Sequence, residues 1–116
     1  MPGLIVNELG KITFSDELLA SIAGYAAMEN YGIVGMSSKK AKDTLFQLIG
    51  TENNKRGVVV TTSDEEMDID LYVTLMYGVS LPAVAENTRK NVRYRVEEMT
   101  GMKVRNVNIH VDSIKV

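Results

Sequence analysis

Residues 67 to 76 alternate apolar and other side chains without a break, and this stretch constrains the fold more than any other part of the chain. Met67, Ile69, Leu71, Val73 and Leu75 fall on one side of an extended strand, and the residues between them fall on the other. This alternation predicts a β-strand with one face buried in a core. Another layer of the protein must therefore cover that face.

The opposite face of this strand changes character along its length. It begins with the acidic residues Asp68 and Asp70 and becomes apolar at Tyr72 and Met76. We therefore expect another element or a partner to cover the end that carries Tyr72 and Met76.

A long amphipathic helix is predicted directly after this strand. Pro82 suits the first turn of a helix, the residue before it marks the boundary, and Gly101 suits a left-handed cap at the end. The predicted buried stripe, at steps of three and four residues, is Leu81, Ala85, Thr88, Val92, Val96 and Met99. Alternation at Val107, Ile109 and Val111 then predicts a closing strand, and a strand–helix–strand crossover can place its two strands parallel.

The first half of the chain predicts shorter elements. Residues 10–14 read as a strand, Ser15 as a helix cap, and Asn30 with Gly32 as the end of the helix that follows. A second short strand is expected at 32–37, a lysine-bearing helix at 38–50 and a polar loop at 51–56. Residues 57–62 are apolar on both faces, which favours a central strand, and they form a hairpin with the strand at 67–76.

These elements predict one α+β domain over residues 1–116. Its order is β-α-β-(α)-β-β-α-β, with two main helices packed on one face of a mostly antiparallel sheet. A chain of 116 residues buries roughly two-thirds of its unfolded surface and needs no disulfide to hold a core.

Composition excludes several kinds of chemistry. The chain has no cysteine, so disulfides, thiolate nucleophiles and cysteine-based metal sites are excluded. No stretch approaches the roughly 20 apolar residues of a membrane span, and no signal peptide is recognisable, so we expect a cytoplasmic protein. Charge is zoned: residues 58–80 hold five acidic and no basic residues, and residues 81–116 hold seven basic and four acidic ones.

Two groups of residues were considered as catalytic or metal sites. His110 and Asp112 lie two apart on one strand face, so they could pair, but no nucleophile signature accompanies them. Asp64, Glu65, Glu66, Asp68 and Asp70 offer oxygens for calcium, but the loop pattern of a calcium site is missing. We predict no catalytic residues, no cofactor and no metal.

A nucleic-acid-binding module is the alternative that the sequence leaves open. The spacing Gly32-Ile33-Val34-Gly35 equals that of the backbone-clamping loop of KH domains, although its middle residues are apolar. Basic residues on the long helix could contact phosphates, but nearby Glu86 and Glu97 could equally pair with them; the basic residues are Arg89, Lys90, Arg93 and Arg95.

Two long segments carry a family resemblance. GKITFSDELLASIAGYAAMENYGIVGMS and IDLYVTLMYGVSLPAVAENTRKNVRYRVEEMTGMKVRNVNIHV resemble the alkaline shock protein 23 family of envelope stress proteins of Gram-positive bacteria. The resemblance covers roughly residues 10–112 and departs at 38–56. It implies a cytoplasmic protein linked to alkaline and envelope stress, in some members held at the membrane by a membrane-spanning partner, with no catalytic residues to transfer.

The sequence therefore predicts a non-enzymatic protein that acts by protein–protein interaction, through a membrane-anchored partner at the cytoplasmic face or by self-association into a homo-oligomer. The residues predicted to contact the partner are Tyr72, Met76, Arg89, Arg93 and Tyr94.

Overall fold

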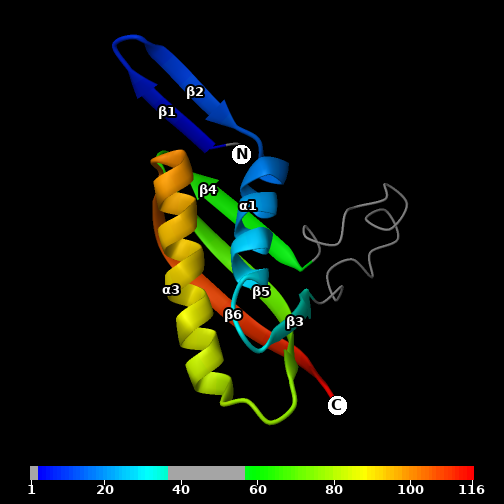
Figure 1. Ribbon diagram of the computed structural model, residues 1–116. Helices are drawn as coiled ribbons and strands as arrows, with labels where there is room; N and C mark the ends of the chain where they lie inside the picture. The colour runs from blue at the N-terminus through cyan, green and yellow to red at the C-terminus, as the bar shows by residue number, and fades with distance from the viewer. Residues whose placement is uncertain (1–2, 37–56) are drawn as a thin grey trace, which may run out of the picture.

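The computed structural model of the chain describes residues 3–36 and 57–116, and the rest of this section concerns those residues. The helix predicted at 38–50 and the loop predicted at 51–56 lie outside them. The described elements, in chain order, are β1 (Gly3–Asn7), β2 (Gly10–Phe14), α1 (Asp16–Met28), β3 (Ile33–Met36), β4 (Val58–Ser63), β5 (Glu66–Met76), α3 (Leu81–Thr100) and β6 (Lys103–Lys115) (Figure 1).

Strand β5 is the centre of the main sheet. Along one edge it pairs in parallel with β6 from end to end. Along the other edge it pairs antiparallel first with β4 and then, further along, with β3. The predicted α+β class, the β4–β5 hairpin and the parallel crossover through α3 are confirmed.

The central position predicted for residues 57–62 was wrong. Among the described strands, β4 pairs only with β5, and it shares that edge with β3. Its second apolar face is explained by Val59, which lies opposite Asp70 on the sheet face away from the helices and stays half-buried there. Apolar residues on both faces therefore did not mark a central strand.

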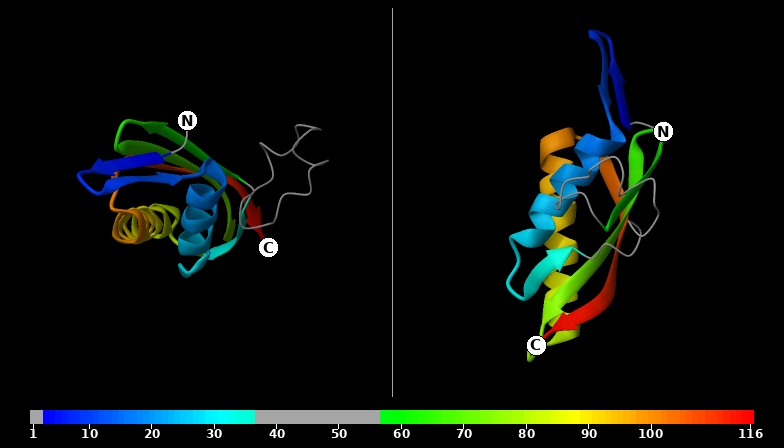
Figure 2. Two further views of the ribbon diagram at one scale, coloured as in Figure 1. Left: turned by 90° about the horizontal axis from the view of Figure 1, so that it is seen from above. Right: turned by 90° about the vertical axis from the view of Figure 1, so that its right-hand side faces the viewer.

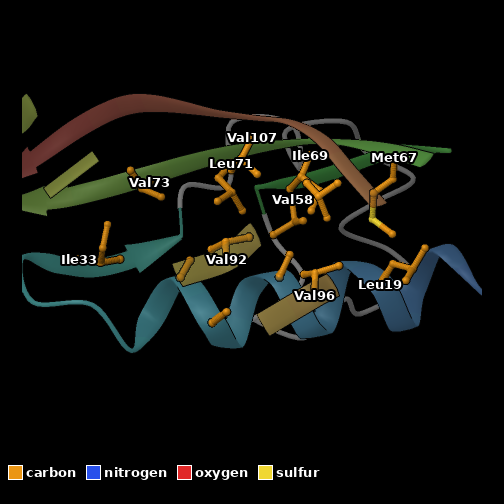
Figure 3. Close-up of a cluster of buried hydrophobic side chains, with 14 of the residues drawn as sticks. Leu19, Ile33, Val58, Met67, Ile69, Leu71, Val73, Val92, Val96 and Val107 are labelled. Atoms are coloured by element: carbon orange, nitrogen blue, oxygen red, sulfur yellow. The ribbon is translucent and has the colours of Figure 1, made fainter. Parts of the chain in front are cut away.

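Both helices lie on one face of the sheet, as predicted (Figure 2). Helix α1 packs over β3 and β4, and α3 packs over β6. Between the layers lies a single apolar core in which Leu19 of α1 and Val92 and Val96 of α3 face the strands (Figure 3). All five apolar residues of the β5 alternation are buried in it: Met67, Ile69, Leu71, Val73 and Leu75.

The predicted helix caps are confirmed in atomic detail. The hydroxyl of Ser15 accepts a hydrogen bond from the backbone N–H of Leu18 at 3.1 Å, which satisfies one of the free donors of the first turn of α1. Gly101 ends α3 in the left-handed conformation, with φ of 75°, and its N–H donates to Glu97 O. Ser80 caps the start of α3 in the same way as Ser15.

The buried stripe of α3 runs obliquely along the helix, whereas the predicted one was straight. Val84 and Thr100 are buried, whereas Leu81 is 40% exposed and Met99 is 65% exposed. The buried residues follow steps of four, namely Val84, Thr88, Val92, Val96 and Thr100. Each step of four turns about 40° further around the helix axis, so the buried side moves around the helix from Val84 to Thr100 and leaves Leu81 and Met99 beside it at the two ends.

Thr88 provides a test of this packing. Its side chain is fully buried, and its Oγ1 has no hydrogen-bond partner among the described residues. An unpaired buried hydroxyl destabilises the folded state, so Thr88→Val should raise the free energy of unfolding by about 1 kcal/mol. Urea denaturation followed by circular dichroism measures the change. A loss of stability would show that the hydroxyl has a partner.

The hairpin of β1 and β2 was only half predicted, because β1 was missed. The two strands pair antiparallel as a separate sheet that projects beyond one end of the main body (Figure 1). Its base is fixed where Gly3 packs so closely on Met102 that a Cβ on Gly3 would lie 2.5 Å from the methionine sulfur. The β-branched run at Ile5 and Val6, followed by a turn-forming stretch, was the signal for β1.

Candidate functional site

The face of the sheet opposite the helices carries a row of polar contacts between β5 and β6. Within the described residues, both helices lie on the other side of the sheet (Figure 2), so no described helix covers these side chains. The row includes four candidate residues from the sequence, Glu66, Asp68, Asp70 and His110, and it divides into two groups.

The first group surrounds His110. Its ring stacks on that of Tyr72, with centroids 4.4 Å apart and an interplanar angle of 12°. Its Nε2 lies 3.0 Å from Oδ1 of Asp70, and the side-chain amide of Asn108 donates to the same oxygen at 3.1 Å. The cross-strand register between β5 and β6 creates this group, because it places His110 directly opposite Tyr72.

The sequence spacing allowed Asp112 as a partner of His110, whereas the structure pairs His110 with Asp70 on the neighbouring strand. A bulge in β6 explains the difference. Beyond Val111 the register shifts, so that Ser113 and not Asp112 lies opposite Thr74. The Ser113 hydroxyl forms a 2.8 Å hydrogen bond with that of Thr74.

The second group neutralises the acidic start of β5. Asp68 receives two hydrogen bonds from the Arg105 guanidinium, at 3.1 and 2.6 Å, and one from the Asn106 amide at 3.1 Å. The bond from Arg105 holds the pKa of Asp68 below its usual value. Glu66 lies 3.7 Å from the Lys103 ammonium. The acidic and basic zones of the sequence thus meet across the β5–β6 ladder.

The predicted contact residues on α3 also have partners within the protein. Arg89 forms a bidentate pair with Glu86, with its Nη2 2.7 and 2.6 Å from the two carboxylate oxygens, and this pair lowers the pKa of Glu86. Arg93 donates to the backbone carbonyl of Arg105 at 3.2 Å. Tyr94 is 62% exposed, and its hydrogen bond with Glu98 raises its pKa.

The five predicted contact residues lie on two surfaces. Tyr72 and Met76 lie on the sheet face away from the helices, and the other three lie on α3. Arg89 lines a groove together with His110, whose ring stacks on that of Tyr72. Tyr94 is about 140° around the helix from Arg89, so it belongs to another side of α3.

This groove, which we call the β6–α3 groove, was not predicted. Its volume is about 480 Å³, and its lining comes from three consecutive elements of the chain. The lining residues are Asp70 of β5, Pro82, Ala85, Glu86 and Arg89 of α3, and Val107, Asn108, Ile109 and His110 of β6. A smaller hollow of about 170 Å³ lies between α1 and α3, beside Tyr25 and Met99.

The glycine spacing at residues 32–35 has a structural explanation. Gly32 ends the turn after α1 with φ of 96°, and Ile33 is buried in the core. Gly35 pairs with Thr74 in the sheet. This segment is therefore part of a strand, whereas the clamp of a KH domain requires an open loop.

The described residues contain no group of three or more histidine, cysteine, aspartate or glutamate side chains placed to hold a metal ion. None of the helices in residues 3–36 and 57–116 is both long and apolar enough to cross a membrane.

The described residues form a two-layer α+β domain with a polar sheet face that no described helix covers. Comparison of the sequence with known families identifies the class more closely. Residues 5–116 match the alkaline shock protein 23 family, which is described as having a cell envelope-related function. The chain belongs to this family. The resemblance seen in the sequence is thereby confirmed. The family is described by its link to the envelope and not by a reaction.

Relatives include both stress-related and uncharacterized proteins. The chain is 42% identical over 111 residues to the uncharacterized protein YloU of Bacillus subtilis, which covers 95% of this chain and 92% of that protein. It is 34% identical over 109 residues to YqhY of the same organism, covering 94% and 80%. It is 26% identical over 106 residues to the stress response regulator gls24 homolog of Streptococcus pyogenes, covering 91% and 59%. No solved structure matches the chain.

Proposed function

We propose that this protein is a non-enzymatic interaction domain of the envelope stress response, which acts by binding another protein. The observation that carries the proposal is the sheet face that no described helix covers, where Tyr72 and Met76 remain only half-buried. Aromatic and methionine side chains are enriched where proteins bind one another. The family's envelope-related description and the stress response names of relatives support the same reading.

The proposed partner is a membrane-anchored protein that holds this domain at the cytoplasmic face of the membrane, or a second copy of the chain. The proposed contact residues are Tyr72, Met76, Arg89, Arg93 and Tyr94.

Among the described residues, the contact between an imidazole and a carboxylate is that of His110 with Asp70. The next hydroxyl along β6, that of Ser113, is hydrogen-bonded to Thr74. This arrangement favours a structural role for His110 over catalysis.

Photo-crosslinking in cells tests the proposal. A photoreactive amino acid is placed at Tyr72 or Met76, and at Tyr25 as the control, because Tyr25 is 63% exposed on α1, on the other side of the sheet from the proposed face. Cells are sampled before and after an alkaline shift, and membrane and soluble fractions are separated. We expect a discrete adduct from positions 72 and 76 that Tyr25 does not give.

The composition of that adduct identifies the partner, and its absence contradicts the proposal. An adduct in the membrane fraction indicates an anchored protein, and one of twice the chain's mass indicates a second copy. If neither position gave an adduct and the purified protein stayed monomeric when concentrated, the proposal would fail. Binding of RNA at low salt that Arg89→Glu with Arg93→Glu abolishes would replace it with the nucleic-acid alternative.

A further inference from the structure

We propose that the outer edge of β6 binds an extended, uncharged peptide segment of a protein partner as an additional strand, seated in the β6–α3 groove. The inference rests on the proposed function in that it requires a protein partner. It adds the binding mode and the chemistry of the segment that is bound. Three features of the described residues support it: a strand edge that no described strand covers, apolar side chains from both the strand and the helix in the groove, and charged side chains that already have partners.

The backbone of β6 offers hydrogen-bonding groups that the sheet does not use. Among the described strands, β6 pairs only with β5. The backbone N–H of Tyr72 donates to the carbonyl of Gly57, on the edge of β5 away from β6. In a parallel pair, only one of two opposite residues bonds to the neighbouring strand, so at the Tyr72–His110 pair the backbone of His110 is the one that bonds to β5. Alternation then turns the backbone groups of Val107, Ile109 and Val111 outward, away from the sheet. These groups can bind a further strand.

The groove places an apolar surface beside these backbone groups. Val107 and Ile109 line it from the strand, and Pro82 and Ala85 line it from the first half of α3. A volume of about 480 Å³ is within the range of peptide and small-molecule sites. A strand edge flanked by a helix, with apolar space between them, is a recurring way to bind an extended peptide.

The charged side chains around the groove already have partners within the protein, and this argues for an uncharged segment. Glu86 and Arg89 are joined by two hydrogen bonds from Arg89 Nη2 and a third from its Nε at 3.1 Å. Oδ1 of Asp70 accepts a hydrogen bond from the Asn108 amide at 3.1 Å and lies 3.0 Å from Nε2 of His110. A charged peptide would have to compete with these contacts, whereas an uncharged one would leave them in place.

One end of the edge is closed, which fixes where the peptide lies. Arg93 occupies the outward carbonyl of Arg105, so an added strand cannot extend past that point without displacing the guanidinium. In the other direction Val111 and Ile114, each 39% exposed, continue the apolar surface beyond the groove. The bound segment therefore extends from Val107 toward the end of β6.

Amide hydrogen exchange along β6, measured by NMR on the full chain, tests the free edge. Without peptide, the outward amides of Val107, Ile109 and Val111 should exchange at least about tenfold faster than those of Asn108 and His110. The probes are two blocked peptides of about eight residues, one alternating serine with valine and one alternating serine with glutamate. The valine peptide should slow the outward amides, and the glutamate peptide should not.

A pair of alanine positions on α3 tests the groove. Ala85→Arg fills the groove from the helix side and should weaken binding of the valine peptide about tenfold. Ala83→Arg is the matched control, because Ala83 is exposed on the same helical turn but does not line the groove, and it should leave the affinity unchanged. Both variants keep the backbone of β6 intact, so a loss of binding reports on the groove.

Several results would overturn the inference. They are equal protection of all β6 amides without peptide, no binding of the valine peptide at about 1 mM, or equal effects of the two arginine variants. Protection that rises with protein concentration alone would assign the edge to a second copy. If crosslinks at Tyr72 persisted in cells that carry Ala85→Arg, the proposed function would still hold, but the proposed peptide site would be wrong.

Discussion

Leu71→Ala should lower the free energy of unfolding by about 2–5 kcal/mol, a large part of the roughly 5–15 kcal/mol that stabilises a domain of this kind. Leu71 is fully buried in the central strand and lies between Val58 of β4 and Ile109 of β6. Truncation leaves a cavity that strands on both sides prevent from closing. The midpoint of thermal unfolding should fall by roughly 10 °C or more, measured by circular dichroism.

Leu18→Ala is the matched control for this prediction. It removes the same atoms from a side chain of α1 that is 46% exposed, so little apolar contact is lost. Its cost should stay below about 1 kcal/mol. Similar losses in the two variants would contradict the placement of Leu71 at the centre of the core.

Gly32→Ala should destabilise the protein by about 2–4 kcal/mol, for two separate reasons. The backbone at Gly32 has φ of 96°, a conformation that a residue with a Cβ adopts only with strain. The added Cβ would also lie 2.8 Å from Cγ2 of Val84, at the start of the buried stripe of α3. Urea denaturation of the variant measures the sum.

Two further variants separate these causes. Gly78→Ala meets an almost identical backbone strain, with φ of 97°, but no atom lies within 4 Å of its new Cβ. The difference between the two variants is therefore the cost of the contact with Val84. Combining Gly32→Ala with Val84→Ala should cost less than the sum of the two single changes. Equal costs at Gly32 and Gly78 would show that α3 yields freely at this point.

The sequence predicted those parts of the fold that depend on local patterns. The alternation at 67–76 identified β5 and its buried side, because apolar residues at every second position indicate a strand with one buried face. Ser15 and Gly101 marked helix ends because capping is decided within one turn. The crossover through α3 correctly predicted the parallel pairing of β5 with β6.

The sequence failed where the environment of a residue depends on distant segments. Met99 fits an apolar stripe, yet it is exposed because the buried row of α3 has turned to Thr100 by the end of the helix. Val59 suggested a central strand, but β3 and β4 divide one edge of β5 between them. Neither arrangement leaves a signal within a short window of sequence.

The candidate surfaces were predicted in part. Tyr72 and Met76 were placed correctly on the outer face of β5, because alternation fixes the face. The stacking of Tyr72 on His110 depends on the register of two strands about 40 residues apart, and the β6–α3 groove depends on the crossing of three elements. These features follow from tertiary structure and have no motif of their own.

The length of α3 has a consequence for how the chain tolerates change. Its 20 residues span about 30 Å, close to the roughly 36 Å of the 11-residue strand β5, so the helix returns the chain to the point where β5 begins. Deleting one helical turn would displace β6 along β5 by about 5.4 Å. This distance lies between one and two residue positions of a strand, so no shift of β6 by whole residues restores its pairing with β5. In family members, the half of the chain from β5 to β6 should therefore change by substitution, because selection should remove insertions and deletions within the helix.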